Sequence, residues 1–201
     1  LLRSRSADLC GILNGIDMNV WNPEIDTLIP KQYNIKTYKA GKKANKKALQ
    51  KMFDLNDAPN IPLFAFIGRF AAQKGLGLLA GAIENAVNSM VCQVVILGSG
   101  DEDAQWYFGG LPTKYSGRVG AYIGYDEIRS HLIEAGSDFF LMPSLYEPCG
   151  LNQLYSQVYG TLPIVRATGG LDDTIEQYNE ETGTGTGFKF YDIDPHALYN
   201  T

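Results

Sequence analysis

The sequence predicts an α/β fold in which helices cover both faces of a parallel sheet. From Pro62 onward, apolar runs of strand length alternate with amphipathic segments of helix length, which is typical of such a sheet. Most of the helical segments open with a polar residue or a glycine, as helix starts do. The chain has 201 residues, of which 45% are hydrophobic and 19% charged, so it can bury a sizeable core.

The predicted elements alternate along the second part of the chain. The strands are expected at residues 62–68, 91–98, 119–124, 139–143, 162–167 and 187–191. The helices are expected at residues 73–87, 101–111, 126–136, 150–160 and 169–178. Residues 61–201 are therefore predicted to form one α/β lobe around a parallel sheet.

Residues 1–60 have a different character. The stretch 14–26, NGIDMNVWNPEID, is rich in Asn, Asp and Pro and is predicted to be an irregular connecting segment. The stretch 42–53 is predicted to be a short basic helix, with four apolar side chains available for burial: Ala44, Leu49, Met52 and Phe53. Its lysines are Lys42, Lys43, Lys46, Lys47 and Lys51. A solvated helix face is the favoured interpretation, and a polyanion site is the alternative.

The overall charge limits the possible partners. A net charge of −5 and a pI near 5.0 argue against a nucleic-acid or anionic-membrane surface, which needs a basic field. No apolar run approaches the roughly 20 residues that cross a bilayer, so a soluble protein is expected. The cysteines Cys10, Cys92 and Cys149 are widely spaced, which predicts neither disulfides nor a zinc site and fits a reducing compartment.

Ligands of parallel α/β sheets bind at the carboxyl ends of the strands, so the loops there hold the candidate site. The first loop, GRFAAQKG at 68–75, places Arg69 at a strand end and Lys74 at a helix start, which suits a diphosphate. It is not a Walker loop, because Gly75 follows the lysine where Ser or Thr is required. Two ordinary surface cations are the alternative.

The second loop, SLYEPCGLNQLY at 144–155, carries Glu147 between a predicted strand and a predicted helix. A fixed carboxylate there could accept sugar hydroxyls or stabilise a developing cation; the alternative is a favourable charge at a helix start. Gly150 allows close backbone approach to a ligand. Cys149 is interpreted as a small wall residue rather than a nucleophile, because no base accompanies it in the motif.

Further candidates are weaker. In RATGGLDDT, 166–174, the stretch from Thr168 through Gly169 and Gly170 offers amides for phosphate or sugar oxygens, although glycine pairs also form plain turns. Tyr125 ends a strand and could stack on a base, or it could be a core aromatic. The motif GSGDE is discounted as a phosphate site because of its acidic pair. The two histidines, His131 and His196, lack metal-ligand spacing and are interpreted as structural.

Several stretches together resemble, in order, the carboxyl-terminal lobe of starch and bacterial glycogen synthases. They are NGIDMNVWNP, NKKALQ, GRFAAQKGL, LGSGDE, IGYDE, MPSLYEPCGLNQLYSQVYGTLPIVRATGGLDDT and GTGF. The resemblance covers nearly the whole chain, and its longest block is far more specific than a single glycine motif. It implies one Rossmann-like lobe of a two-lobed, GT-B type, retaining α-1,4-glucosyltransferase. Such an enzyme transfers glucose from ADP-glucose, or UDP-glucose in some members, to an α-glucan.

The resemblance also implies roles for particular residues. Arg69 and Lys74 match the pair that grips the donor diphosphate, and Glu147 matches the essential carboxylate near the transferred glucose. The segment that borders this sugar is matched by Cys149, Gly150 and Leu151. Tyr125 matches the aromatic residue against the adenine. No metal or other cofactor is implied, and the partners are the nucleotide sugar and the glucan acceptor.

One position separates this chain from many retaining two-lobed transferases. They carry a second glutamate eight residues after the first, where this chain has Tyr155, which favours glucan synthases over sucrose-type or lipopolysaccharide transferases. The amino-terminal lobe is expected to be missing, residues 1–60 to lead in from it, and the isolated lobe to be inactive. Another nucleotide-sugar transferase and a non-catalytic binding module are the alternatives. The expected location is the bacterial cytoplasm, or the plastid stroma if the source is a plant.

Overall fold

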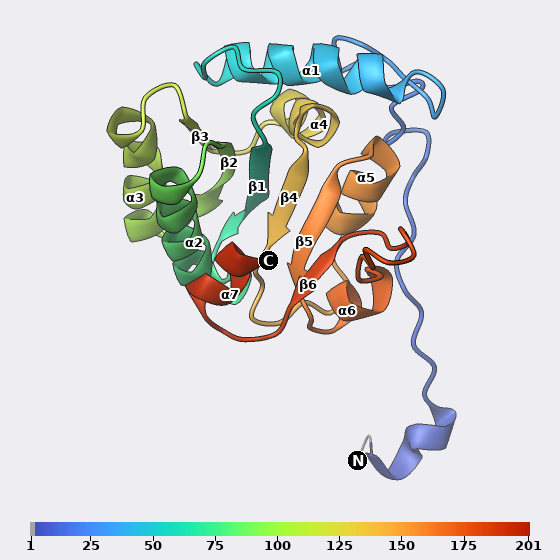
Figure 1. Cartoon of the computed structure of the whole chain (residues 1–201). Coiled ribbons are helices and arrows are strands. Elements are labelled where there is room, and N and C mark those ends of the chain that lie inside the picture. Colours follow the sequence, from blue (N-terminus) through green and yellow to red (C-terminus); the bar gives the residue numbers. More distant parts are fainter. Residues whose placement is uncertain (1–2) are drawn as a thin grey trace.

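The computed structural model describes residues 3–201 and contains a six-stranded sheet of order β3-β2-β1-β4-β5-β6 (Figure 1). The strands are β1 (Leu63–Phe70), β2 (Gln93–Gly100), β3 (Val119–Ile123), β4 (Phe139–Met142), β5 (Leu162–Arg166) and β6 (Phe188–Phe190). Every neighbouring pair is parallel. The predicted fold class and all six predicted strands are confirmed.

The helices lie between the strands as predicted, with differences at three places. They are α1 (Tyr38–Met52), α2 (Leu76–Ser89), α3 (Glu102–Lys114), α4 (Glu127–Gly136), α5 (Asn152–Tyr159), α6 (Gly170–Thr174) and α7 (Pro195–Asn200), with short 3-10 turns η1 (Arg3–Asp8) and η2 (Ala72–Lys74). The prediction of one helix over 169–178 is wrong beyond Thr174, because Ile175 is extended and Gln177 bridges to Gly187. Helix α7 was not predicted, and α1 begins four residues early.

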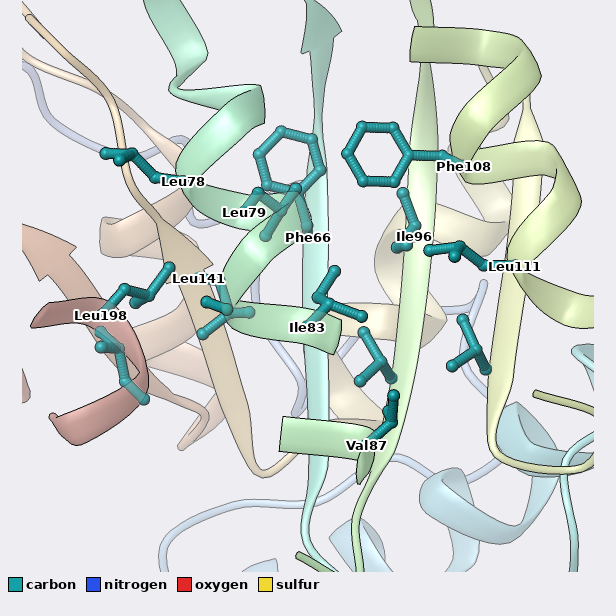
Figure 2. Close-up of a cluster of buried hydrophobic side chains, with 14 of the residues drawn as sticks. Phe66, Leu78, Leu79, Ile83, Val87, Ile96, Phe108, Leu111, Leu141 and Leu198 are labelled. Carbon is teal, nitrogen blue, oxygen red and sulfur yellow. The ribbon is translucent and has the colours of Figure 1, made fainter. Parts of the chain in front are cut away.

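Two apolar clusters hold the layers together. On one face of the sheet, α2, α3 and α7 bury their apolar stripes against the strands, and Figure 2 shows Leu79, Ile83 and Phe108 converging on Phe66 and Ile96. Such side chains each contribute about 1.5–3 kcal/mol when fully buried. A second cluster on the opposite face includes Leu49 of α1, Ile133 of α4 and Leu171 of α6. The sheet is therefore covered on both faces, which fixes the position of its carboxyl edge.

Helix α1 is only partly the solvated basic helix that the sequence predicts. The side chains of Lys43, Lys47 and Lys51 are exposed, but Lys46 is buried and its ammonium lies 2.6 Å from a carboxylate oxygen of Asp138. Lys42 donates to the hydroxyl of Thr161 at 2.6 Å, and burial lowers the pKa of Lys42 to about 7. The prediction of a uniformly solvated face is wrong for these two lysines. Helix α1 packs on α4 at the amino ends of the strands (Figure 1), and both lysines donate to groups there.

The apolar side chains of α1 divide in the same way. Leu49 and Phe53 are buried as predicted, whereas Ala44 and Met52 are exposed, which contradicts the prediction for them. Since the buried residues belong to the same cluster as strand β1, the core extends across the predicted boundary at residue 60. The division into 1–60 and 61–201 itself stays a prediction. Within residues 3–201, no helix is both long and apolar enough to cross a membrane.

Replacing Gly110 with alanine is expected to raise the free energy of unfolding. Gly110 is exposed in the interior of α3, and a methyl group added there would meet no atom within 4 Å. Alanine restricts the unfolded chain more than glycine, which is worth about 0.5–1 kcal/mol in a helix. Denaturant unfolding of both proteins measures the change. The matched control is Gly120→Ala on β3, where the methyl group would clash with Phe53 and the stability should fall.

Candidate functional site

The strand order reverses direction between β1 and β4, and we call the place between the carboxyl ends of these two strands the crevice. From β1 the chain moves outward through β2 to β3, then returns to β4 and moves outward the other way to β6. Loops that leave the carboxyl ends of two such strands diverge to opposite faces, and ligands of open α/β sheets bind between them. The first and second candidate loops leave these two strands. Lys74 follows β1, and Glu147 follows β4.

Lys74 and Glu147 form an ion pair at this crevice. The Lys74 ammonium lies 2.5 Å from Oε2 of Glu147, and the hydroxyl of Ser144 donates to the same oxygen at 3.1 Å. Glu147 is only 8% exposed, and the Lys74 side chain is 23% exposed. A charge-assisted hydrogen bond in such a partly desolvated place is stronger than one on an open surface. The structure thus brings together two predicted site residues that lie 73 positions apart.

Backbone contacts between the two loops set this geometry. The Leu145 amide donates to the carbonyl of Gln73 at 2.8 Å, and the Gln73 side-chain amide donates to the carbonyl of Tyr146 at 3.1 Å. Gly75 has φ +69, and a Cβ at this position would lie 1.9 Å from the carbonyl oxygen of Pro143. Only glycine allows this approach. The glycine after the lysine therefore serves loop packing, and it brings Lys74 beside the second loop.

The stretch 166–174, the third candidate loop, packs against the second one. The Gly170 amide donates to the carbonyl of Glu147 at 3.0 Å, and Gly170 is buried. The expectation that this amide faces a ligand is wrong, because the backbone of Glu147 already occupies it. Gly169 is exposed and Thr168 is half-buried, and a Cβ on Gly169 would lie 2.2 Å from the same carbonyl. The glycine pair is thus needed for close packing against the Glu147 loop.

Three further residues that were not predicted hold the second loop in place. Ser144 contacts the Glu147 carboxylate, and Arg166 at the end of β5 donates to the carbonyls of Ser144, at 2.8 Å, and Leu145. Asn152 at the start of α5 donates to the carbonyl of Ile67 in β1 at 3.2 Å. An arginine at the end of an apolar strand was a usable indication for Arg166. Nothing in the sequence distinguishes Ser144 or Asn152 from other loop residues.

Arg69 and Tyr125 lie at the same carboxyl edge without joining the ion pair. Arg69 is exposed at the end of β1, and within residues 3–201 its side chain makes no hydrogen bond or ion pair. Tyr125 follows β3 and is 81% exposed, so the alternative of a core aromatic is wrong. Because β3 is two strands from β1, the ends of these strands are separated by roughly 10 Å along the edge. From β3 to β4, this edge therefore carries the Tyr125 ring, the Arg69 cation and then the Lys74–Glu147 ion pair.

The segment after Glu147 borders the crevice. The Cys149 sulfur accepts from the Asn14 amide at 3.3 Å, which fits a wall residue better than a nucleophile. Gly150 has φ +78, and Leu151 is partly exposed at the start of α5. Tyr155 does not stand free where the second carboxylate of other transferases would be, since its ring stacks on Trp21 with centroids 4.0 Å apart.

The remaining candidates have structural roles. His131 is buried and lies 2.8 Å from a carboxylate oxygen of Asp26, so its structural interpretation is confirmed. In the discounted GSGDE motif, the Asp101 side chain accepts from the Ala104 amide and caps α3. Among residues 3–201, no group of three or more His, Cys, Asp or Glu side chains could hold a metal ion.

Known proteins are similar to this chain over most or all of its length. Residues 45–199 match the family model described as glycosyl transferases group 1. The chain is 51% identical over its whole length to glycogen synthase 1 of Geobacter sulfurreducens and 49% identical to glycogen synthase of Treponema denticola. It spans 40% and 41% of the lengths of these two relatives.

A solved structure is similar over almost the whole chain. The catalytic domain of starch synthase IV from Arabidopsis thaliana, bound to ADP and acarbose, superposes with a TM-score of 0.91. The two are 37% identical, and the similarity covers 99% of this chain and 41% of the other. The predicted resemblance to starch and glycogen synthases is thereby confirmed.

Proposed function

The chain belongs to the glycosyl transferases of group 1, and from this premise we propose that it is the donor-binding lobe of a retaining α-1,4-glucosyltransferase that elongates glycogen or starch. The observation that carries the proposal is the Lys74–Glu147 pair at the crevice between β1 and β4. The glycogen synthase relatives and the ADP-bound starch synthase support it. Because the chain spans 40% of its first relative, the activity is proposed for the enzyme that also contains an amino-terminal lobe.

The proposed donor lies along the carboxyl edge of the sheet. Its adenine stacks on the exposed ring of Tyr125, its diphosphate contacts Arg69 and Lys74, and its glucose reaches Glu147 and the backbone from Cys149 to Leu151. The separation of roughly 10 Å between the ends of β3 and β1 leaves room for a ribose between the base and the diphosphate. ADP-glucose is the proposed donor, and UDP-glucose is the alternative.

In the proposed reaction, the bond between the glucose C1 and the diphosphate oxygen breaks as the oxygen of an acceptor hydroxyl bonds to C1 from the same face. The diphosphate leaves with the electron pair of the broken bond and accepts the proton of the hydroxyl. Positive charge develops on the sugar ring, and the Glu147 carboxylate is placed to stabilise it. Negative charge builds on the leaving diphosphate, where the Arg69 guanidinium and the Lys74 ammonium offset it. Since the two cations supply this stabilisation, the transfer is proposed to need no metal ion or other cofactor.

The acceptor is proposed to be the non-reducing end of an α-glucan, held between this lobe and the amino-terminal lobe. Both walls are needed for the reacting geometry, so this chain alone is expected to bind nucleotide weakly and to catalyse no transfer. The bacterial sources of the curated relatives support a bacterial cytoplasmic enzyme. The plastid stroma is the alternative location.

Calorimetric titration of this chain with ADP, UDP and GDP tests the proposed donor. ADP is expected to bind most tightly, and Arg69→Ala to weaken it about tenfold, because one charge-assisted contact is lost. Arg5→Ala is the matched control, since Arg5 is also exposed but lies in η1 and pairs with Asp8. Tighter binding of UDP would favour UDP-glucose as the donor, and tighter binding of GDP would favour another nucleotide-sugar transferase. Absence of binding by all three would contradict the proposed donor site.

A further inference from the structure

A segment at the start of the chain runs along helix α5, and we call residues 14–33 the strap. Its backbone passes beside α5 in Figure 1, and three contacts join it to the helix and to the residue segment just before it. The Asn14 amide donates to the Cys149 sulfur just before the helix, the Trp21 ring stacks on Tyr155, and Asp26 accepts from the Tyr159 hydroxyl. The strap therefore follows α5 from the candidate site to its far end.

The central contact is a three-ring stack. Trp21 lies between His131 of α4 and Tyr155 of α5, with centroid separations of 3.9 Å and 4.0 Å and interplanar angles of 13° and 7°. Stacked aromatic pairs are each worth about 0.5–1.5 kcal/mol beyond their burial. Since His131 and Tyr155 belong to different helices, the indole fixes the spacing between α4 and α5.

The end of the strap is held by a buried carboxylate. Asp26 is 4% exposed, and its Oδ2 atom lies 2.6 Å from the Tyr159 hydroxyl and 2.8 Å from Nδ1 of His131. Burial raises the pKa of this carboxyl, but the hydrogen bonds from His131 and Tyr159 outweigh burial and leave the pKa below its ordinary value. Tyr33, also in the strap, donates to the carbonyl of Tyr159 at 2.7 Å. Asp26 thus ties the strap to the same two helices as Trp21.

Helix α5 needs such external support. It has eight residues, whereas isolated helices shorter than about 12–15 residues are marginal in water. Tyr155 and Tyr159 are one turn apart on the face that meets the strap, and the candidate site lies directly before the first turn. A shift of α5 would therefore move the backbone from Glu147 to Leu151. Displacements near 1 Å at a reacting centre can lower rates about a hundredfold.

We propose that Trp21 and Asp26 are positioning residues, which hold α5 and thereby the Glu147–Leu151 segment in the geometry that accepts a sugar nucleotide. Neither residue is placed in contact with the donor. They act through Tyr155, Tyr159 and His131. The donor part of this inference depends on the proposed function, whereas the mechanical part depends only on the contacts above.

Hydrogen exchange of the full chain tests the mechanical part. Trp21→Leu keeps apolar volume but removes the stack, and amide exchange in the peptide covering 147–155 is expected to rise about tenfold or more, through local opening. Exchange of β2 should stay unchanged. Trp106→Leu is the matched control, because Trp106 is 82% exposed on α3. A uniform rise across the chain, or no rise at 147–155, would overturn the proposal.

Two further variants separate positioning from general stability. Trp21→Phe retains an aromatic ring and should restore most of the protection of 147–155. Asp26→Asn keeps the size of the side chain but weakens the bond to Tyr159, so it should loosen the same peptide. If Trp21→Leu does not fold, these two variants still decide the question: equal exchange to wild type in Asp26→Asn would contradict the proposal.

Nucleotide affinity then tests the donor part. ADP binding should weaken about three- to tenfold in Trp21→Leu, recover in Trp21→Phe and stay unchanged in Trp106→Leu. If the wild-type chain binds no ADP, the proposed function fails while the exchange result still stands. If exchange rises at 147–155 but ADP affinity is unchanged, the strap does not position the donor site, and that part of the inference is wrong.

Discussion

Replacing Lys74 with alanine is expected to lower turnover of the full-length enzyme about 10²–10³-fold, the usual loss when one fixed donor to transition-state charge is removed. The ammonium lies 2.5 Å from Glu147 at the crevice, where it can face the leaving diphosphate. Its loss also leaves the buried Glu147 carboxylate with Ser144 as its remaining side-chain partner among residues 3–201. Incorporation of glucose from ADP-glucose into glycogen measures the effect.

The way the loss of activity divides between kcat and KM distinguishes this role from simple binding of the donor. Charge on the departing diphosphate is greatest in the transition state, so kcat should fall more than the KM for ADP-glucose rises. Lys114→Ala is the matched control, because Lys114 pairs with Glu84 at 2.7 Å on the surface of α2 and α3. That variant should keep wild-type turnover. Wild-type turnover in Lys74→Ala would rule out the proposed role.

The sheet could be predicted from the sequence because its strands are buried on both faces. Runs such as those of β2 and β4 are apolar without alternation, and loops with glycine or polar residues separate them from the helices. The meeting of Lys74 with Glu147 was also predictable. Each follows a strand, and the carboxyl ends of parallel strands lie at one edge. The sequence does not encode the strand order directly, so the 2.5 Å contact itself needed the structure.

The predictions for individual residues are wrong where tertiary contacts override the local sequence pattern. Lys42 and Lys46 look like members of a solvated run, but helix α1 turns them toward buried acceptors at the amino edge of the sheet. Gly170 looks like part of an open anion-binding turn, but its amide donates a hydrogen bond to the carbonyl of Glu147. The acceptors Thr161, Asp138 and Glu147 lie far from these three residues along the chain, so no local stretch of sequence reveals the contacts.

The contacts of the strap, an irregular segment, could not be predicted from local sequence either. Asn, Asp and Pro identified residues 14–26 as non-helical, yet composition gives no reason for Trp21 to lie between two rings from different helices. Its stacking partner Tyr155 occupies the position where other transferases carry a second carboxylate. The structure thus gives this position a packing role, which the sequence comparison alone left open.

Replacing Gly169 with alanine is expected to destabilise the fold by roughly 3 kcal/mol or more, through a forbidden backbone conformation and a clash. Gly169 has φ +50 and ψ −133, and a Cβ there would lie 2.2 Å from the carbonyl oxygen of Glu147. To relieve the clash, the Glu147 loop must move away from the third loop. The variant should therefore also lose nucleotide affinity. Thermal and denaturant unfolding measure the first effect, and ADP titration the second.

Gly183→Ala is the control for this loss, because it has a positive φ without the clash. Gly183 also has a left-handed φ of +67, but a Cβ there would meet no atom within 4 Å. It should cost only about 1 kcal/mol, the penalty of the left-handed conformation, and leave ADP affinity unchanged. The remaining difference between the two variants then contains the close contact between Gly169 and the Glu147 carbonyl, together with the additional backbone cost of ψ −133 at Gly169. Equal, small losses of stability in both variants would show that the Glu147 loop moves away at little cost. That result would contradict a rigidly placed carboxylate.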